Sequence, residues 1–176
     1  MRKSFVAFTV MAALATPAAA QDATGTVAID GSVAGRCLFT IPNETISLGE
    51  MSLPGSDASA GRLDTSTVNG RSATLNGWCN SAAAGMTVES FPLLNTAAGA
   101  TGFTNRVDYT ATASANGTDG TDTTLTAGGG TQVSVGMFTG DILVTLSDAS
   151  APSNGILVAG DYTGRVEVTL TPTFVP

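Results

Sequence analysis

Histidine is absent from this sequence of 176 residues, which also contains only two cysteines and one tryptophan. Histidine is the commonest general base in enzymes and a frequent metal ligand, so its absence excludes a Ser-His-Asp triad and histidine-ligated metals. The cysteines do not form the Cys-x-x-Cys motif of redox-active pairs, and no glycine-rich phosphate-binding motif opens a helix. We therefore expect a protein that is not an enzyme and that carries no cofactor and no metal.

Basic residues are also scarce, with 7 Lys and Arg against 14 Asp and Glu. Two of the basic residues, Arg2 and Lys3, precede an apolar run that ends in small residues at Ala20, and this pattern predicts a secretory signal peptide over residues 1–20. Removal of this segment leaves 5 basic and 14 acidic residues, a net charge of −9. So acidic a chain repels phosphate backbones and anionic lipid surfaces, and we expect no nucleic-acid partner.

Beyond residue 20, the sequence lacks any apolar run near the roughly 20 residues that a membrane-spanning helix needs, so we expect no membrane insertion. The two cysteines, Cys37 and Cys79, would enter an oxidising compartment after export, where a lone pair usually forms a disulfide. Two free buried thiols are the alternative.

Convincing helical periodicity is missing as well, and short apolar alternations between turn residues predict an all-β sandwich. The clearest strand is the last one in the chain, and its apolar face carries Val166, Val168, Leu170 and Phe174. Pro172 cannot donate a hydrogen bond to a ladder, so this end of the strand should lie at an edge of its sheet or at a bulge. Residues 45–48 should form a short strand, whereas residues 113–131 read as a surface loop because they are rich in Gly, Thr and Asp.

Residues 21–35 form a separate segment in which apolar and polar positions alternate directly after the predicted leader. Val27, Ile29 and Val33 share one face with Gly31 between them, whereas the other face is polar or small. Glycines weaken this strand pattern, and an N-terminal segment is loose unless something holds it. The pattern fits either a detachable arm, which the three glycines favour, or the first strand of a self-contained sandwich.

Three stretches occur in a fixed order along the chain. They are GTVAIDGSVAGRC, which ends at Cys37, then LNGWC, which ends at Cys79, and AGDYTGRVEVTLTPTF near the C-terminus. Together they resemble subunits of chaperone–usher pili, including the spore coat protein U-like branch. The resemblance implies an immunoglobulin-like sandwich over residues 36–176 that lacks its final strand. It also implies an N-terminal donor-strand extension over residues 21–35 and a disulfide between the first two strands.

In this family, the missing strand leaves a hydrophobic groove, which a periplasmic chaperone fills until the extension of the next subunit displaces it. The resemblance therefore implies passage through the periplasm and an outer-membrane usher to a surface fibre of identical or related subunits. One domain with an extension implies a shaft-type subunit rather than a two-domain tip adhesin. The donor face would consist of Val27, Ile29, Gly31 and Val33. The acceptor groove would be lined by Val166, Val168, Leu170 and Phe174.

Two other functions are compatible with the sequence. A secreted monomeric β-sandwich could bind a ligand or a carbohydrate through Trp78 or the 95–105 loop, although a tryptophan beside Cys79 is by default a packed residue. A hydrolase could use two of the 14 carboxylates, although the sequence does not single out a pair.

Overall fold

The computed structural model describes residues 22–173, and the chain divides into two units, with the boundary between Ser32 and Val33. The predicted signal peptide and Phe174 lie outside the described residues. Residues 22–32 contain no helix or strand, and their side chains are exposed.

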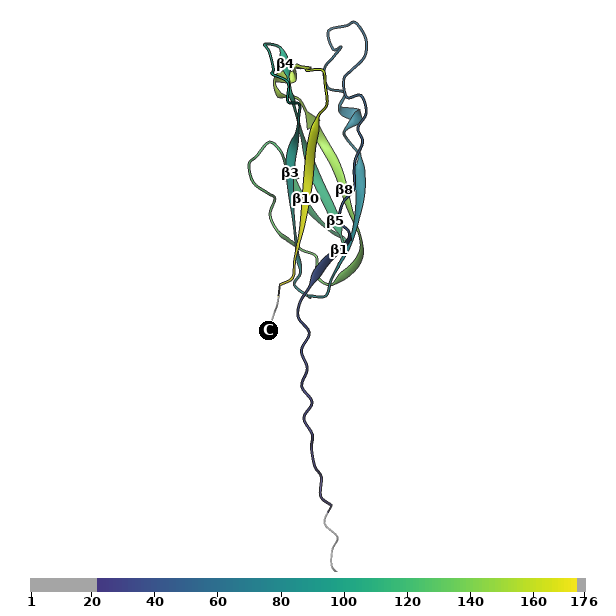
Figure 1. The fold of residues 1–176 in the computed structure, drawn as a ribbon, viewed down its shortest axis with the longest axis vertical. Helices are drawn as coiled ribbons and strands as arrows, with labels where there is room; N and C mark the ends of the chain where they lie inside the picture. The colour runs from purple at the N-terminus through teal and green to yellow at the C-terminus, as the bar shows by residue number, and fades with distance from the viewer. Residues whose placement is uncertain (1–21, 174–176) are drawn as a thin grey trace, which may run out of the picture. The chain divides into compact units, whose positions relative to one another are not determined.

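The second unit consists almost entirely of β-strands, which confirms the predicted all-β fold (Figure 1). The strands among the described residues are β1 (Cys37–Ile41), β2 (Ser72–Cys79), β3 (Gly85–Leu94), β4 (Phe103–Thr104), β5 (Arg106–Ala115), β6 (Thr118–Thr123), β7 (Val133–Ser134), β8 (Phe138–Ser150), β9 (Ile156–Leu157) and β10 (Thr163–Thr171). Two short 3-10 helices, Thr65–Thr67 and Pro152–Asn154, lie in the connections.

Most strands belong to one antiparallel sheet, whose order is β1-β2-β8-β5-β3-β10, with β6 added to β5 and β7 to β3. Strand β5 serves both halves of this sheet. It pairs with β3 only at its start, at Arg106 and Val107, and pairs with β8 and β6 further along. The sheet therefore folds over on itself into a nearly closed sandwich, in which β3 and β10 lie in front of β5 and β8 in Figure 1.

The core lies between the two layers of this folded sheet. In β5, Val107, Tyr109 and Ala111 are buried. They meet apolar residues of the neighbouring strands, such as Met86 on β3 and Ile142 on β8, which are fully buried. Burial alternates along the strands because successive side chains point to opposite faces of a sheet.

The predicted disulfide is present and joins the first two strands of the sandwich. Cys37 and Cys79 are directly opposite each other in the β1–β2 ladder, with their Cα atoms 4.1 Å apart. The bond therefore fastens β1, which is the end strand of the sheet, to its neighbour.

The prediction of a surface loop over residues 113–131 is wrong in its first half. Strand β5 continues to Ala115, and a tight turn at Asn116 and Gly117 leads directly into β6. Both turn residues have positive φ, 50° and 73°, which is the geometry that an Asn-Gly pair favours in a two-residue hairpin. Composition indicated a loop, but the Asn-Gly dipeptide was the stronger local signal.

The predicted strand over residues 45–48 is not formed. The β1–β2 register is irregular between Phe39 and Ile41, and residues 42–48 have no strand partner. Ile46 and Leu48 are nevertheless half-buried against the core, so this irregular segment still covers one side of the sandwich.

Candidate functional site

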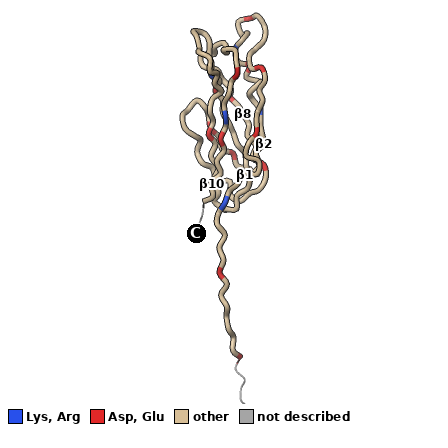
Figure 2. Tube along the Cα trace, viewed as in Figure 1, with Lys and Arg blue, Asp and Glu red and all other residues tan. Residues whose placement is uncertain are grey.

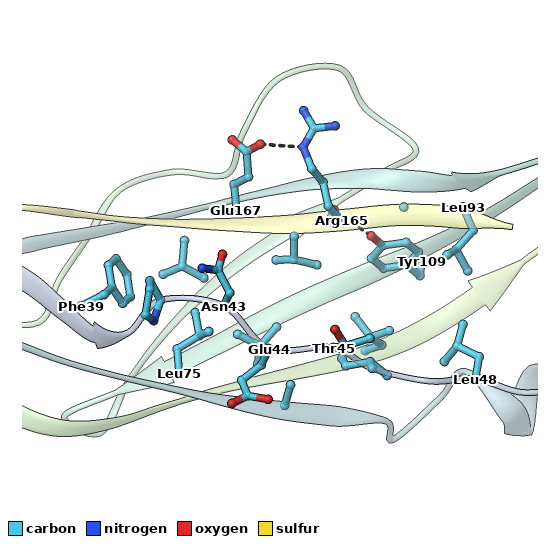
Figure 3. A pocket seen from close by; sticks show the side chains of 18 of the residues that line it. Phe39, Asn43, Glu44, Thr45, Leu48, Leu75, Leu93, Tyr109, Arg165 and Glu167 are labelled. Atoms are coloured by element: carbon cyan, nitrogen blue, oxygen red, sulfur yellow. Dashed lines mark hydrogen bonds and ion pairs between the residues drawn. The ribbon is translucent and has the colours of Figure 1, made fainter.

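A groove lies where the two ends of the folded sheet approach without pairing (Figure 3). Among the described residues, β10 pairs with β3 alone, and β1 pairs with β2 alone. A cavity of about 650 Å³ occupies the gap between them. One wall is formed by Phe39 and residues 42–48, and the other by residues 164–169 of β10. Two edges of the backbone thus face each other across an open space.

The floor of this groove is apolar because it consists of inward-facing side chains of the strands beneath the gap. These side chains are Ala73 and Leu75 of β2, Leu93 of β3, Tyr109 of β5, and Val144 and Leu146 of β8. A sandwich of this kind would normally carry a further strand over such a floor, since apolar surface left in water costs about 25 cal/mol per Å². The groove therefore has the shape and the polarity of a site for an extended, apolar strand.

Tyr109 fixes the position of the β10 wall from below. Its hydroxyl lies 2.7 Å from the carbonyl oxygen of Phe91 on β3 and 3.0 Å from that of Arg165 on β10, and so can donate to either. Only 2% of the residue is exposed, and burial raises the pKa of this hydroxyl to about 12. The tyrosine thus fastens two strands together at the floor of the groove and remains a neutral donor at physiological pH.

The outer side of the β10 wall is charged. Figure 3 shows the side chains of Arg165 and Glu167 pointing away from the cavity, and they form an ion pair of 2.6 Å. The Arg165 guanidinium also stacks on the ring of Phe91, 3.6 Å from its centroid. Arg165 is the one cation among the residues that line the cavity, whereas Glu44 on the opposite wall is acidic. Basic positions are few throughout the described chain (Figure 2).

A second cavity of about 620 Å³ adjoins the first and is lined along one side by residues 45–52. The residues that line both cavities are Thr45, Ile46, Leu48, Leu93 and Gly164. Glu50, Asp161 and Tyr162 line only the second one. The hollow is therefore an elongated channel rather than a closed pocket for a small molecule.

The residues predicted for an acceptor groove fall in different places. Val166 and Val168 line the cavity. Leu170 packs beside Gly77 instead, at the end of the groove, where its Cδ1 atom would lie 3.5 Å from a Cβ on that glycine. The sequence pattern did not predict that residues 42–48 would form the opposite wall, which follows from the register shift in β1 between Phe39 and Ile41.

The residues predicted for a donor face are uncovered. The exposed fractions of Val27, Ile29 and Val33 are 85%, 92% and 80%, which are unusually high values for a row of large apolar side chains. Gly31 has no neighbouring atom within 4 Å of the position of a Cβ. The structure thus contains an uncovered apolar row and an uncovered apolar groove.

Trp78, the predicted carbohydrate contact, is half-buried on the outer face of β2, between its ladder partners Leu38 and Thr139. It lines neither of the two cavities described above. Within residues 22–173, no three His, Cys, Asp or Glu side chains are grouped as ligands for a metal ion. In the same part of the chain, no helix has the length and apolar character needed to cross a bilayer.

Comparisons with protein-family models, with curated proteins and with solved structures found no match to this chain.

Proposed function

We propose that this protein is a structural subunit of an exported fibre, in which residues 21–35 of one copy occupy the groove of the next. The observation that carries this proposal is the pair of unpaired edges on either side of an apolar groove. The chain itself supplies a segment of matching character, since Val27, Ile29 and Val33 alternate with polar or small residues and are uncovered. Addition of an extended segment to an exposed edge is a recurrent mode of protein assembly.

The energetics favour such a contact. Burial of three apolar side chains contributes roughly 5–9 kcal/mol at about 1.5–3 kcal/mol each. The added strand would also form ladder hydrogen bonds with the free edge of β10, each worth about 1 kcal/mol. Because donor segment and groove are different parts of the same chain, the contact joins unlike surfaces and repeats from copy to copy. An interface between unlike surfaces produces a fibre when it does not close into a ring.

The resemblance to chaperone–usher pilus subunits supports a route for this assembly. Residues 1–20 would direct export and be removed, a periplasmic chaperone would cover the groove during transit, and an outer-membrane usher would pass the subunit to the cell surface. An uncovered edge above an apolar floor is prone to aggregation, so a subunit of this kind needs a temporary partner until the next copy arrives.

The test compares the assembly of the exported chain with and without residues 21–35. Size-exclusion chromatography and electron microscopy measure the state of assembly. We expect the complete chain to form fibres and the shortened chain to remain monomeric. Fibres formed by the shortened chain would refute the proposal.

A pair of variants on β10 tests the groove itself. Val168→Asp places a carboxylate in the cavity and should abolish fibres, because the incoming apolar strand would then bury a charge. Thr171→Asp places the same charge on an exposed position of β10 that lines neither cavity and should leave fibres intact. Circular dichroism of the monomers checks that both variants fold.

A further inference from the structure

The two ends of the groove differ in what surrounds them. At the Leu170 end, the beginning of the folded unit packs against the residues after β10, since a Cβ on Gly35 would lie 3.6 Å from the Cβ of Pro172. At the Tyr162 end, the groove opens into the second cavity. An arm of a second copy running parallel to β10 would bring its own folded unit, which begins at residue 33, to the occupied end. An arm running antiparallel to β10 brings that unit to the open end.

Side-chain alternation restricts how an antiparallel arm aligns with β10. The apolar face of the arm carries Val27 and Ile29, and the half-buried face of β10 carries Val166 and Val168. Both faces point into the groove only in alignments that differ by steps of two residues. In each of these alignments, Asp30 lies on the outer face, opposite one of the exposed residues of β10. Those residues are Thr163, Arg165, Glu167, Thr169 and Thr171.

The charges on the outer face distinguish these alignments. Glu167 is already opposite Glu89 in the β3–β10 ladder, so a third carboxylate beside it would add to the repulsion. Arg165 is opposite the uncharged Phe91, its side chain is 60% exposed, and it is the one cation that lines the cavity. A carboxylate opposite Arg165 would form a cross-strand pair of opposite charge, which stabilises a sheet.

We infer that Asp30 of one copy lies opposite Arg165 of the next, and that this ion pair selects the register of the intermolecular strand. In this register, Val27 lies beside Val168 and Ile29 beside Val166. The inference rests on the proposed function and specifies which residues of the two copies meet. Asp30 and Arg165 would thus determine which alignment of the two strands forms, although neither lies in the apolar part of the contact.

Cysteine cross-linking in fibres of the exported chain tests the register without removing a charge. Thr169→Cys is combined in turn with Thr24→Cys, Thr26→Cys and Ala28→Cys, which all lie on the outer face of the arm. Only Thr26 is opposite Thr169 in the inferred register, and the other two are displaced by two residues in either direction. A displacement of two residues moves the partner by about 7 Å, which is beyond the reach of a disulfide.

We expect the Thr26→Cys pair to give at least about fivefold more cross-linked dimer on non-reducing gels than either displaced pair. A larger yield from a displaced pair, equal yields from all three, or fibres without cross-links would each overturn the inferred register. These results would leave the proposed function intact, because the fibres themselves would still form. Absence of fibres from the unmodified chain would instead remove the proposed function.

Charge reversal tests whether the ion pair selects the register. In the background of the Thr26→Cys and Thr169→Cys pair, Asp30→Arg should lower the cross-linked yield about fivefold, which corresponds to about 1 kcal/mol for an exposed pair. Addition of Arg165→Glu should restore the yield, and Ser32→Arg should serve as a matched outer-face control without that loss. An unchanged yield in Asp30→Arg, or no recovery in the double reversal, would show that the apolar residues alone set the register.

Discussion

The side chain of Asn80 forms hydrogen bonds with the backbone of Arg36 and of Ala34, two residues that lie just before β1. Its Oδ1 atom accepts a hydrogen bond from the Arg36 N–H at 2.5 Å, while its Nδ2 atom donates to the carbonyl oxygen of Ala34 at 3.0 Å. The backbone N–H of Asn80 donates to the carbonyl oxygen of Arg36, also at 3.0 Å. These bonds continue the β1–β2 ladder beyond the disulfide and hold the residues that immediately precede β1.

Replacement of Asn80 by Ala should therefore lower the free energy of unfolding by about 1–2 kcal/mol, since two hydrogen bonds of the side chain are lost. Urea denaturation measures the change. Asn80→Asp keeps the acceptor for Arg36 and loses the donor to Ala34, so its stability should fall between those of the alanine variant and the unmodified chain. Unchanged stability of the alanine variant would show that water replaces these two hydrogen bonds without any loss of folding free energy.

The disulfide should contribute more than any single hydrogen bond. The Cys37–Cys79 bond closes a loop with a sequence separation of 42 residues. In the chain-entropy description such a closure stabilises the folded state by roughly 4 kcal/mol. Replacement of both cysteines by Ser should lower the free energy of unfolding by about that amount in chemical denaturation. A double variant as stable as the unmodified chain would contradict this prediction. A single replacement leaves one free thiol, and it therefore shows whether such a thiol forms non-native dimers.

Alkaline pH should weaken the fold through Tyr109. Burial raises the pKa of its hydroxyl from 10.0 to about 12, so the folded state disfavours the phenolate. The stabilisation is complete below pH 10, where both states are protonated, and is lost as the pH rises from 10 towards 12. At pH 11 the loss should be about 1.4 kcal/mol, the equivalent of one pKa unit. Urea denaturation at pH 9 and pH 11 measures it, and Tyr109→Phe should show a smaller loss of stability over this interval.

The turn between β5 and β6 should depend on glycine at its second position. Gly117 has a φ of 73°, in the left-handed region that costs other residues about 1–2 kcal/mol. Gly117→Ala should therefore lower the free energy of unfolding by about 1–2 kcal/mol, and the melting temperature should fall as well. Gly25→Ala is a matched control, because a Cβ there meets no atom within 4 Å and its φ is outside that region. Equal stability of the two variants would show that the turn accommodates a side chain.

Several features of the fold could be predicted from the sequence because they depend on local patterns. The alternation of Val166, Val168 and Leu170 predicted one apolar face of the last strand, and these side chains are half-buried against the core. Pro172 predicted an edge or a bulge at the end of the last strand, and β10 ends at Thr171 and is an edge strand that pairs with β3 alone among the described residues. The disulfide could be expected because a lone pair of cysteines in an exported chain usually becomes oxidised.

The groove, in contrast, depends on residues that are far apart in the chain, and only the tertiary structure shows it. Its floor combines side chains from β2, β3, β5 and β8, and one wall is the irregular segment 42–48, which the sequence pattern had indicated as a strand in part. The bonds from Tyr109 to Phe91 and Arg165 join three strands and have no local signature. By itself the sequence determined the period of the strands and the apolar alternation at Val27, Ile29 and Val33, whereas their exposure is a property of the structure. Which edges pair and which remain open was decided by packing, because pairing between distant strands depends on how the whole sheet folds over its core.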